Sequence, residues 1–178
     1  PSNQQKPKSV TFILCAGSRD ETQCTWCCRI GCMTALKQVY LLREKLGEDV
    51  ELNLCYNDLR SFGKGYEEFY RKVRGLHTNM FRGCPSEVRT MKDHLKIDIF
   101  DTTTSKLFEI KTDMVVLVPA MMPRTDAIEF ARLLHLTLSG DGFFLEAHPK
   151  LRPVDTFVNG IFIAGCCQAP KDIQDTVS

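Results

Sequence analysis

The residues best suited to chemistry in this sequence are cysteines, and five of the nine lie within one short stretch. This stretch, the cysteine segment, runs from Cys15 to Cys32 and reads CAGSRDETQCTWCCRIGC, with thiols at Cys15, Cys24, Cys27, Cys28 and Cys32. Thiolates near the start of a helix gain from the helix dipole, which lowers their pKa and favours metal ligation. Four such sulfur ligands suit either an iron-sulfur cluster or a tetrahedral zinc ion, and spacing does not separate the two.

Two further interpretations of the cysteines stay open at this point. Free cysteine is often a buried core residue, and we interpret the isolated Cys55 and Cys84 in that structural way. The polar residues of the cysteine segment make the same interpretation less favoured there. A disulfide reductase could use the adjacent pairs Cys27-Cys28 or Cys166-Cys167, but adjacent cysteines form strained rings, so we rank this last.

The elements that must position the cysteine segment form a predicted βαβ unit. An apolar run at 10–14 predicts a buried parallel strand, helical spacing of apolar residues follows through residue 45, and Gly47 indicates a helix stop. A second strand is predicted at 50–56, with a right-handed crossover. A dinucleotide-binding fold would place G-x-G-x-x-G in the position of the cysteine segment, and this sequence has none, which disfavours NAD(P) binding.

The following residues complete the predicted first domain. We expect a helix at 66–73, a strand and turn within 79–88, a hairpin formed by 94–100 and 106–110, and an apolar strand at 114–118. This order predicts an α/β fold: a Rossmann-like parallel sheet of the pyridine-nucleotide-domain type with a β-meander. We assign it to residues 9–123, after a lead-in at 1–8 that we expect to be disordered.

Residues 124–178 show a different pattern, interpreted as the C-terminal part of an FAD-binding domain. We expect a helix at 127–136, short strands at 143–145 and 154–156, a strand at 160–165, and a final helix capped by Asp172 or Asp175. The sequence begins with Pro1 and stops soon after this helix begins, so we expect a fragment of a longer chain.

Composition limits the classes of function. The 178 residues are 43% hydrophobic and carry a net charge of +1, which is typical of a globular protein and argues against a nucleic-acid partner. No apolar run approaches the ~20 residues of a membrane span, and no signal peptide is recognised, so we expect a cytoplasmic protein. The four histidines are scattered, and we predict no catalytic residue.

Five motifs resemble the HdrA-type subunit of heterodisulfide reductase and its relatives in sulfur metabolism. In chain order they are CAGSRDE, GCMTALKQ, DLRSFGKGYEEFY, GFFLEAHPKLRPVDT and GIFIAGCCQAPKDIQDTV, and they extend from about Val10 to the chain end. The resemblance implies an FAD-bearing iron-sulfur protein with a thioredoxin-reductase-like core, acting in a large complex.

The resemblance also implies two sets of cofactor residues. A [4Fe-4S] cluster would be bound by Cys15, Cys27 and Cys32, and because Gly31 replaces a cysteine of the family, we predict Cys28 as the fourth ligand, with Cys24 as the alternative. The flavin would be lined by residues of the tail motif, in which Ala169 replaces a glycine. They are Gly165, Cys166, Gln168, Ala169, Pro170, Lys171 and Asp172.

The function expected on this basis is an electron-transfer module, an oxidoreductase subunit that is inactive as a fragment. The FAD site is expected to be partial, because a glycine-rich ADP-binding half and ferredoxin-like cysteine motifs are absent from the sequence. Its partners would be other subunits of a heterodisulfide-reductase-like complex, and a homodimer is a further option. The alternative from another class is a structural or docking domain whose cysteine site holds zinc or nothing.

Overall fold

The computed structural model describes residues 5–177 and divides the chain into two compact units. The sheet unit comprises the residues up to Trp26 together with Gly31–Ala120. The tail unit comprises Cys27–Ile30 and the residues from Met121 onward. The predicted division of the chain at residue 123 stays a prediction, and residues 1–4 of the predicted lead-in lie outside the described residues.

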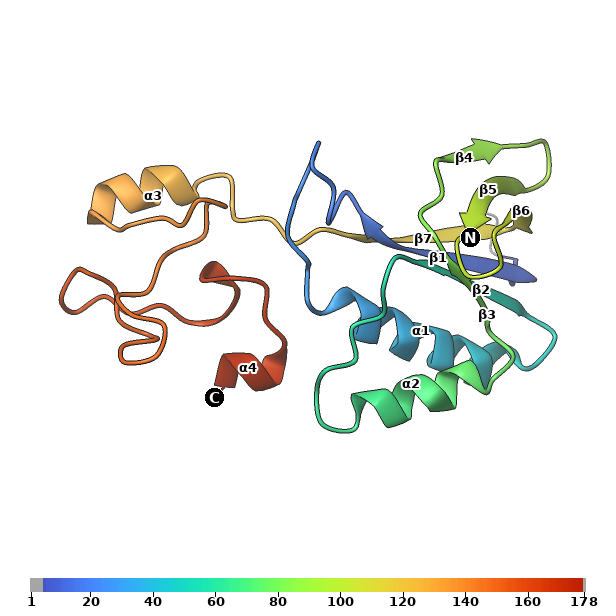
Figure 1. The fold of residues 1–178 in the computed structure, drawn as a ribbon, viewed down its shortest axis with the longest axis horizontal. Helices are drawn as coiled ribbons and strands as arrows, with labels where there is room; N and C mark the ends of the chain where they lie inside the picture. The colour runs from blue at the N-terminus through green and yellow to red at the C-terminus, as the bar shows by residue number, and fades with distance from the viewer. Residues whose placement is uncertain (1–4, 178) are drawn as a thin grey trace. The chain divides into compact units, whose positions relative to one another are not determined.

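The sheet unit is built on four parallel strands in the order β3-β2-β1-β7. These are β1 (Ser9–Ala16), β2 (Glu51–Tyr56), β3 (Asn79–Arg82) and β7 (Met114–Pro119). Helix α1 (Gly31–Leu46) connects β1 to β2, and α2 (Tyr66–Arg74) connects β2 to β3, as Figure 1 shows. The predicted Rossmann-like α/β architecture is confirmed.

Side-chain alternation along β1 explains why the sheet is covered on both faces. Val10, Phe12 and Leu14 belong to a buried cluster with Leu36 of α1, whereas Ile13 belongs to a second cluster with residues of the meander. Successive side chains of a strand point to opposite faces, so a continuous apolar run requires apolar cover on both. In Figure 1 the two helices lie below the sheet and the meander lies above it.

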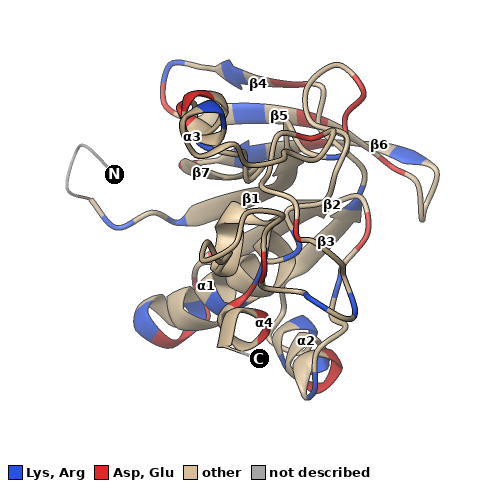
Figure 2. Cartoon of the chain, turned by 90° about the vertical axis from the view of Figure 1, so that its left-hand side faces the viewer, with Lys and Arg blue, Asp and Glu red and all other residues tan. Residues whose placement is uncertain are grey.

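The meander consists of β4 (Glu87–Thr90), β5 (Leu95–Asp101) and β6 (Lys106–Thr112), paired antiparallel in that order. Its buried face contributes Ile97, Ile99 and Ile110 to the second core cluster. Its outer face mixes charges of both signs (Figure 2), and Lys96 Nζ on β5 lies 2.5 Å from Glu109 Oε2 on the neighbouring β6. The predicted hairpin is confirmed, with cross-strand ion pairs on its polar side.

The end of α1 follows the predicted stop signal. Gly47 has φ +81°, and its N–H donates to the carbonyl oxygen of Arg43 at 3.0 Å. The Arg43 guanidinium Nη1 then donates to the carbonyl oxygens of Gly47, Glu48 and Val50. Positive φ is easy for glycine, and the arginine satisfies carbonyl groups of the turn that follows the helix.

The tail unit contains the helices α3 (Ala127–Leu134) and α4 (Ile173–Val177) and a short 3-10 turn, η1 (Gly165–Cys167). The strands predicted at 143–145, 154–156 and 160–165 are wrong. In their place are isolated bridges between Leu138 and Phe144 and between Asp155 and Phe162. A strand needs a continuous partner ladder, and these apolar stretches have none among the described residues.

Many large apolar side chains of the tail unit are exposed. Among the described residues, both hydrophobic core clusters consist of side chains of the sheet unit. In the tail unit Ala127, Ala131, Phe143 and Ile163 are buried, but Leu133 is 73% exposed. No helix among residues 5–177 combines the length and apolar character needed to cross a bilayer.

Candidate metal centre and cofactor site

Cys15 and Cys32 are brought together by the sheet unit. Cys15 lies near the end of β1, beside an irregularity in the pairing with β7, and Cys32 lies in the first turn of α1. Both thiols are buried and belong to the same core cluster. Both residues lie at the carboxyl end of β1, because the loop that follows this strand leads directly into the first turn of α1. That Cys15 and Cys32 bind one metal centre stays a prediction.

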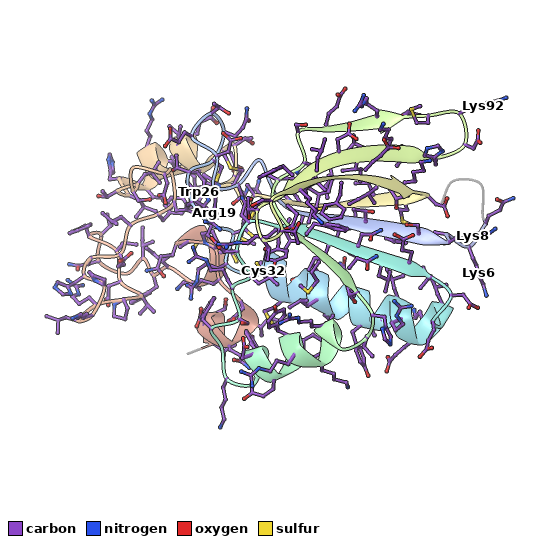
Figure 3. The ribbon with its side chains drawn as sticks, turned by 45° about the vertical axis from the view of Figure 1, so that its right-hand side comes forward. Lys6, Lys8, Arg19, Trp26, Cys32 and Lys92 are labelled. Carbon is purple, nitrogen blue, oxygen red and sulfur yellow. The ribbon has the colours of Figure 1, made fainter. Side chains whose placement is uncertain are left out.

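The residues between these two cysteines form a tight loop. The N–H of Asp20 donates to the carbonyl oxygen of Cys24 at 2.9 Å, and the carbonyl oxygen of Trp26 accepts from Arg19 N at 3.2 Å and from Ser18 Oγ at 2.7 Å. Cys24 is buried, and its Sγ lies 3.8 Å from the same Trp26 oxygen. Figure 3 shows Arg19, Trp26 and Cys32 at the carboxyl end of β1, opposite Lys8.

Cys27 and Cys28 belong to the tail unit. Cys27 Sγ accepts the N–H of Arg29 at 3.3 Å, and the carbonyl oxygen of Cys28 accepts the N–H of Ile30 at 2.7 Å. Because α1 begins at Gly31, Cys28 precedes the helix and does not share a helix face with Cys32.

The donors of the cysteine segment fit a metal centre in their chemistry. All its cysteines are free thiols, and four of the five are buried. Non-glycine residues with positive φ occur at Cys15 (58°), Arg19 (58°) and Arg29 (60°), a conformation that costs free energy and often marks functional sites. Among residues 5–177, no three His, Cys, Asp or Glu side chains are arranged as a ready metal site.

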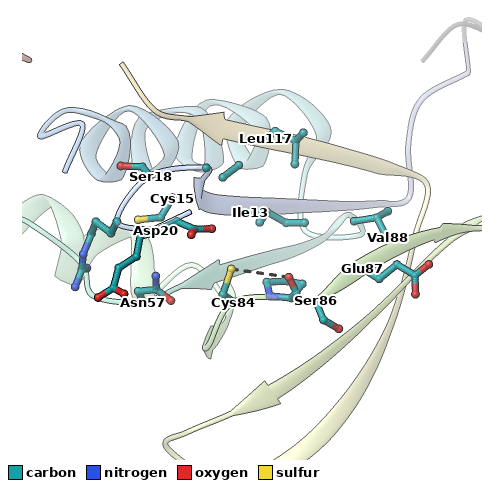
Figure 4. Close-up of a pocket in the computed structure, with 15 residues that line it drawn as sticks. Ile13, Cys15, Ser18, Asp20, Asn57, Cys84, Ser86, Glu87, Val88 and Leu117 are labelled. Atoms are coloured by element: carbon teal, nitrogen blue, oxygen red, sulfur yellow. Dashed lines mark hydrogen bonds between the residues drawn. The ribbon is translucent and has the colours of Figure 1, made fainter. Parts of the chain in front are cut away.

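A pocket of about 550 Å³ opens at the carboxyl end of β1, within the sheet unit. Cys15 and Cys84 both line it, with Asp20 and Glu87 among the polar residues and Leu117 on the apolar side (Figure 4). In a dinucleotide-binding fold this edge of the sheet receives the pyrophosphate. Carboxylates lining the pocket repel phosphate, which adds to the argument from the missing glycine motif.

Cys55 and Cys84 differ more than the sequence suggested. Cys55 in β2 is fully buried, and burial, reinforced by the neighbouring Cys84, raises its pKa to about 12. Cys84 is exposed at the pocket, although burial of its thiol and the charge of Asp20 raise its pKa as well. Cys55 thus fits the structural role that we assigned to it, whereas Cys84 is accessible to reagents.

Asp58, which was not among the predicted site residues, accepts hydrogen bonds from two arginine side chains. Its Oδ2 lies 2.9 Å from Arg19 Nη2, and its Oδ1 lies 3.0 Å from Arg82 Nη2. Hydrogen bonds from Arg19 and then Arg82 lower the pKa of the Asp58 carboxyl. Two sequence signals were available: Asp58 opens the motif DLRSFGKGYEEFY, and it lies just after the strand at 50–56, where parallel strands present functional side chains.

Several of the residues predicted to line a flavin make hydrogen bonds within the tail unit. Gln168 Nε2 donates to Glu146 at 2.9 Å, and Lys171 Nζ lies 2.5 Å from Gln168 Oε1. The hydrogen bond from Gln168 lowers the pKa of Glu146. Asp172 Oδ1 accepts the N–H of Asp175 at 2.7 Å, so Asp172 caps α4, as one of the two predicted options has it.

Gly165 and an apolar pocket lie beside these residues. Gly165 has φ +65°, and a Cβ at this position would lie 3.2 Å from Thr176 Cγ2, so glycine suits the turn. A pocket of about 510 Å³ within the tail unit is lined by Cys166 and Cys167 and by apolar residues, including Phe130 and Phe144. Cys166 alone among the predicted flavin residues lines it.

Comparison with solved structures defines the class of fold. A thioredoxin reductase from Lactococcus lactis superposes with a TM-score of 0.59 at 15% identity, over 95% of this chain and 46% of that chain. The T. acidophilum thioredoxin reductase gives a TM-score of 0.54 at 16% identity, over 94% of this chain and 46% of that chain. No protein-family model matches the chain. The fold is thus that of a thioredoxin-reductase-like α/β protein.

Comparison with curated sequences defines the family. The chain is 43% identical over 182 residues to a CoB–CoM heterodisulfide reductase iron-sulfur protein of the HdrA type from Methanopyrus kandleri, and 45% identical over 184 residues to its counterpart from Methanocaldococcus jannaschii. Both matches cover the whole chain and 28% of the relative. The chain is therefore homologous to a segment of the HdrA family, and the resemblance noted from the motifs is confirmed.

Proposed function

We propose that the chain is an electron-transfer module of an HdrA-like protein of heterodisulfide reductase, carrying a [4Fe-4S] cluster and part of an FAD site. The observation that carries the proposal is the cysteine segment: a relative with "iron-sulfur" in its name matches the whole chain, and the sheet unit places two of the segment's cysteines in one buried cluster. Its partners would be the other subunits of a redox complex.

Cys15, Cys27, Cys28 and Cys32 would bind the cluster, with Cys24 as the alternative fourth ligand. A cluster of this kind accepts and donates single electrons, and its potential depends on burial and on hydrogen bonds to sulfur. Burial of Cys15, Cys28 and Cys32 would limit solvent access. The N–H of Arg29 already donates to Cys27 Sγ at 3.3 Å, which is the type of contact that stabilises an anionic sulfur.

The tail unit would supply part of the flavin site. Two of its predicted residues, Gln168 and Lys171, are hydrogen-bonded to each other, and Cys166 lines an apolar pocket. Exposed apolar side chains such as Leu133 and Ile173 suit contact with further protein. The chain spans about 28% of the length of the curated relatives that it matches, so the rest of the site would come from outside this sequence.

Anaerobic reconstitution tests the cluster. Protein treated with iron and sulfide should retain about four irons per chain and show visible charge-transfer absorption, as expected of a four-thiolate cluster. Cys28→Ser should lose most of the iron, and Cys84→Ser, an exposed cysteine outside the predicted ligand set, is the matched control. If Cys28→Ser retains all its iron, Cys28 is not the fourth ligand. The alternative ligand, Cys24, is then tested with Cys24→Ser.

A docking domain with a zinc site is the second candidate. It is favoured by the exposed apolar surface of the tail unit and by the preference of zinc for four thiolates. Stoichiometric zinc without iron under the same anaerobic conditions, with no redox signal, would replace the electron-transfer proposal by this one.

A further inference from the structure

Asp58 connects two segments that are distant in sequence. Each oxygen of its carboxylate serves one arginine: Oδ2 faces Arg19 Nη2 at 2.9 Å, and Oδ1 faces Arg82 Nη2 at 3.0 Å. Arg19 belongs to the cysteine segment, whereas Arg82 ends β3. Both partners and Asp58 belong to the sheet unit.

Asp58 and Arg82 are connected to the parallel sheet by strand pairing and by hydrogen bonds. Asp58 follows β2, the strand that pairs with both β1 and β3. Arg82 also donates through Nε to the carbonyl oxygen of Asn57 at 3.3 Å, and its backbone N–H donates to Asp101 Oδ1 at 2.9 Å. Asp58 thus lies two residues beyond the end of β2, in a segment that Arg82 of β3 contacts through both the Asn57 carbonyl and the Asp58 carboxylate.

Arg19 and Asp58 are each connected to a candidate cluster ligand, Cys24 and Cys32 respectively. The backbone N–H of Arg19 donates to the carbonyl oxygen of Trp26, and Cys24 Sγ contacts the same oxygen at 3.8 Å. The backbone carbonyl oxygen of Asp58 itself lies 3.7 Å from Cys32 Sγ. One residue thus contacts the first turn of α1 through its main chain and the loop of Arg19 through its side chain.

We propose that Asp58 is a positioning residue for the cysteine segment: by holding Arg19 against the sheet, it keeps the Ser18–Trp26 loop folded beside Cys15 and Cys32. This inference rests on the proposed function for its link to a cluster. The loop geometry can be tested without any metal, so the failure of one proposal is distinguishable from the failure of the other.

The test uses Asp58→Asn, which keeps the shape but removes one of the two acceptor oxygens and the charge. In metal-free protein the buried Cys24 should be alkylated at least several-fold faster in this variant than in wild type, measured site by site by mass spectrometry. In reconstituted protein, iron should be released to a chelator several-fold faster. Asp126→Asn, which breaks an exposed ion pair with Arg124 in the tail unit, is the matched control and should change neither rate.

Cys55, which is fully buried in β2, reports whether the fold itself is lost. If Cys55 becomes reactive in Asp58→Asn, that variant has lost its fold, and Arg19→Gln is tested in its place. Arg19→Gln leaves the Asp58–Arg82 ion pair intact, and we expect it to expose Cys24 but not Cys55. Cys24 alkylation at the wild-type rate in both variants would overturn the positioning role. Wild-type protein that binds no iron while Asp58→Asn still exposes Cys24 would overturn the proposed function and leave the positioning role standing.

Discussion

The sheet unit and the tail unit use apolar residues in different ways. In the sheet unit, β1 and β2 are covered on both faces, and Leu52 and Leu54 are fully buried. In the tail unit, Leu151 is 79% exposed and Ile173 is 83% exposed. The sheet unit therefore contains its own core, whereas the tail unit carries exposed apolar surface.

The cysteines follow the same contrast. Cys55 lies inside the sheet unit with a pKa raised to about 12, whereas Cys166 and Cys167 of the tail unit are exposed. A thiol reacts through its thiolate, so reactivity should separate the two units sharply.

The largest expected effect is therefore in alkylation of native protein at pH 8. Because its pKa lies near 12, Cys55 should be ionised in only about one molecule in ten thousand, and burial excludes the reagent as well. We expect Cys166 and Cys167 to react at least about a thousand-fold faster, measured by iodoacetamide labelling and mass spectrometry. All nine cysteines should react in denaturant, which is the control. Comparable native rates at Cys55 and Cys166 would show that the two units do not differ in thiol reactivity.

The next effect is on the free energy of unfolding. Leu54→Ala removes a fully buried side chain from the sheet core and should cost about 2–5 kcal/mol. Ile173→Ala alters an exposed side chain of the tail unit and should change stability by less than about 0.5 kcal/mol. Urea unfolding followed by circular dichroism measures both. Equal losses would mean that the tail unit has a core of its own.

The smallest effect concerns residues 27–30, which belong to the tail unit although they lie inside the cysteine segment. Arg29 Nη2 lies 2.5 Å from Asp175 Oδ2, and both side chains are more than a third exposed. Asp175→Asn should therefore reduce stability by about 1 kcal/mol or less, yet it should speed proteolysis at Arg29. Trypsin cleavage followed by mass spectrometry measures this, with Asp126→Asn as the control. Unchanged cleavage at Arg29 would show that the ion pair does not hold the segment.

Most of the sheet unit could be predicted because its signals are local. Apolar runs such as 10–14 have the length and composition of buried strands, and Gly47 marks the end of α1 with a positive φ. The strands predicted in the tail unit failed for a physical reason. Apolar residues at 143–145 and 160–165 resemble strand residues, but a strand forms only where a neighbouring strand supplies the hydrogen-bond ladder.

The cysteine ligands were predicted from the sequence and stay a prediction, whereas the charged residues that contact the cysteine segment were not predicted. The density of cysteines indicated a metal centre without any structure. Asp58, Arg19 and Arg82 are ordinary charged residues in sequence, 39 and 24 positions apart, and nothing local relates them. Cys84 and Cys15 line the same pocket although they are distant in sequence, so the exposure of Cys84 there could not be predicted either.

Residue types and their spacing were enough to predict the order of the strands and helices of the sheet unit, the cysteine segment between β1 and α1, and the resemblance to the HdrA family. These depend on residue type and short-range periodicity, which a single chain displays directly. Tertiary structure alone decided that Cys15 and Cys32 share one buried cluster and that Asp58 joins Arg19 to Arg82. Such contacts arise because parallel strands bring their carboxyl ends to one edge of the sheet, where residues distant in sequence meet.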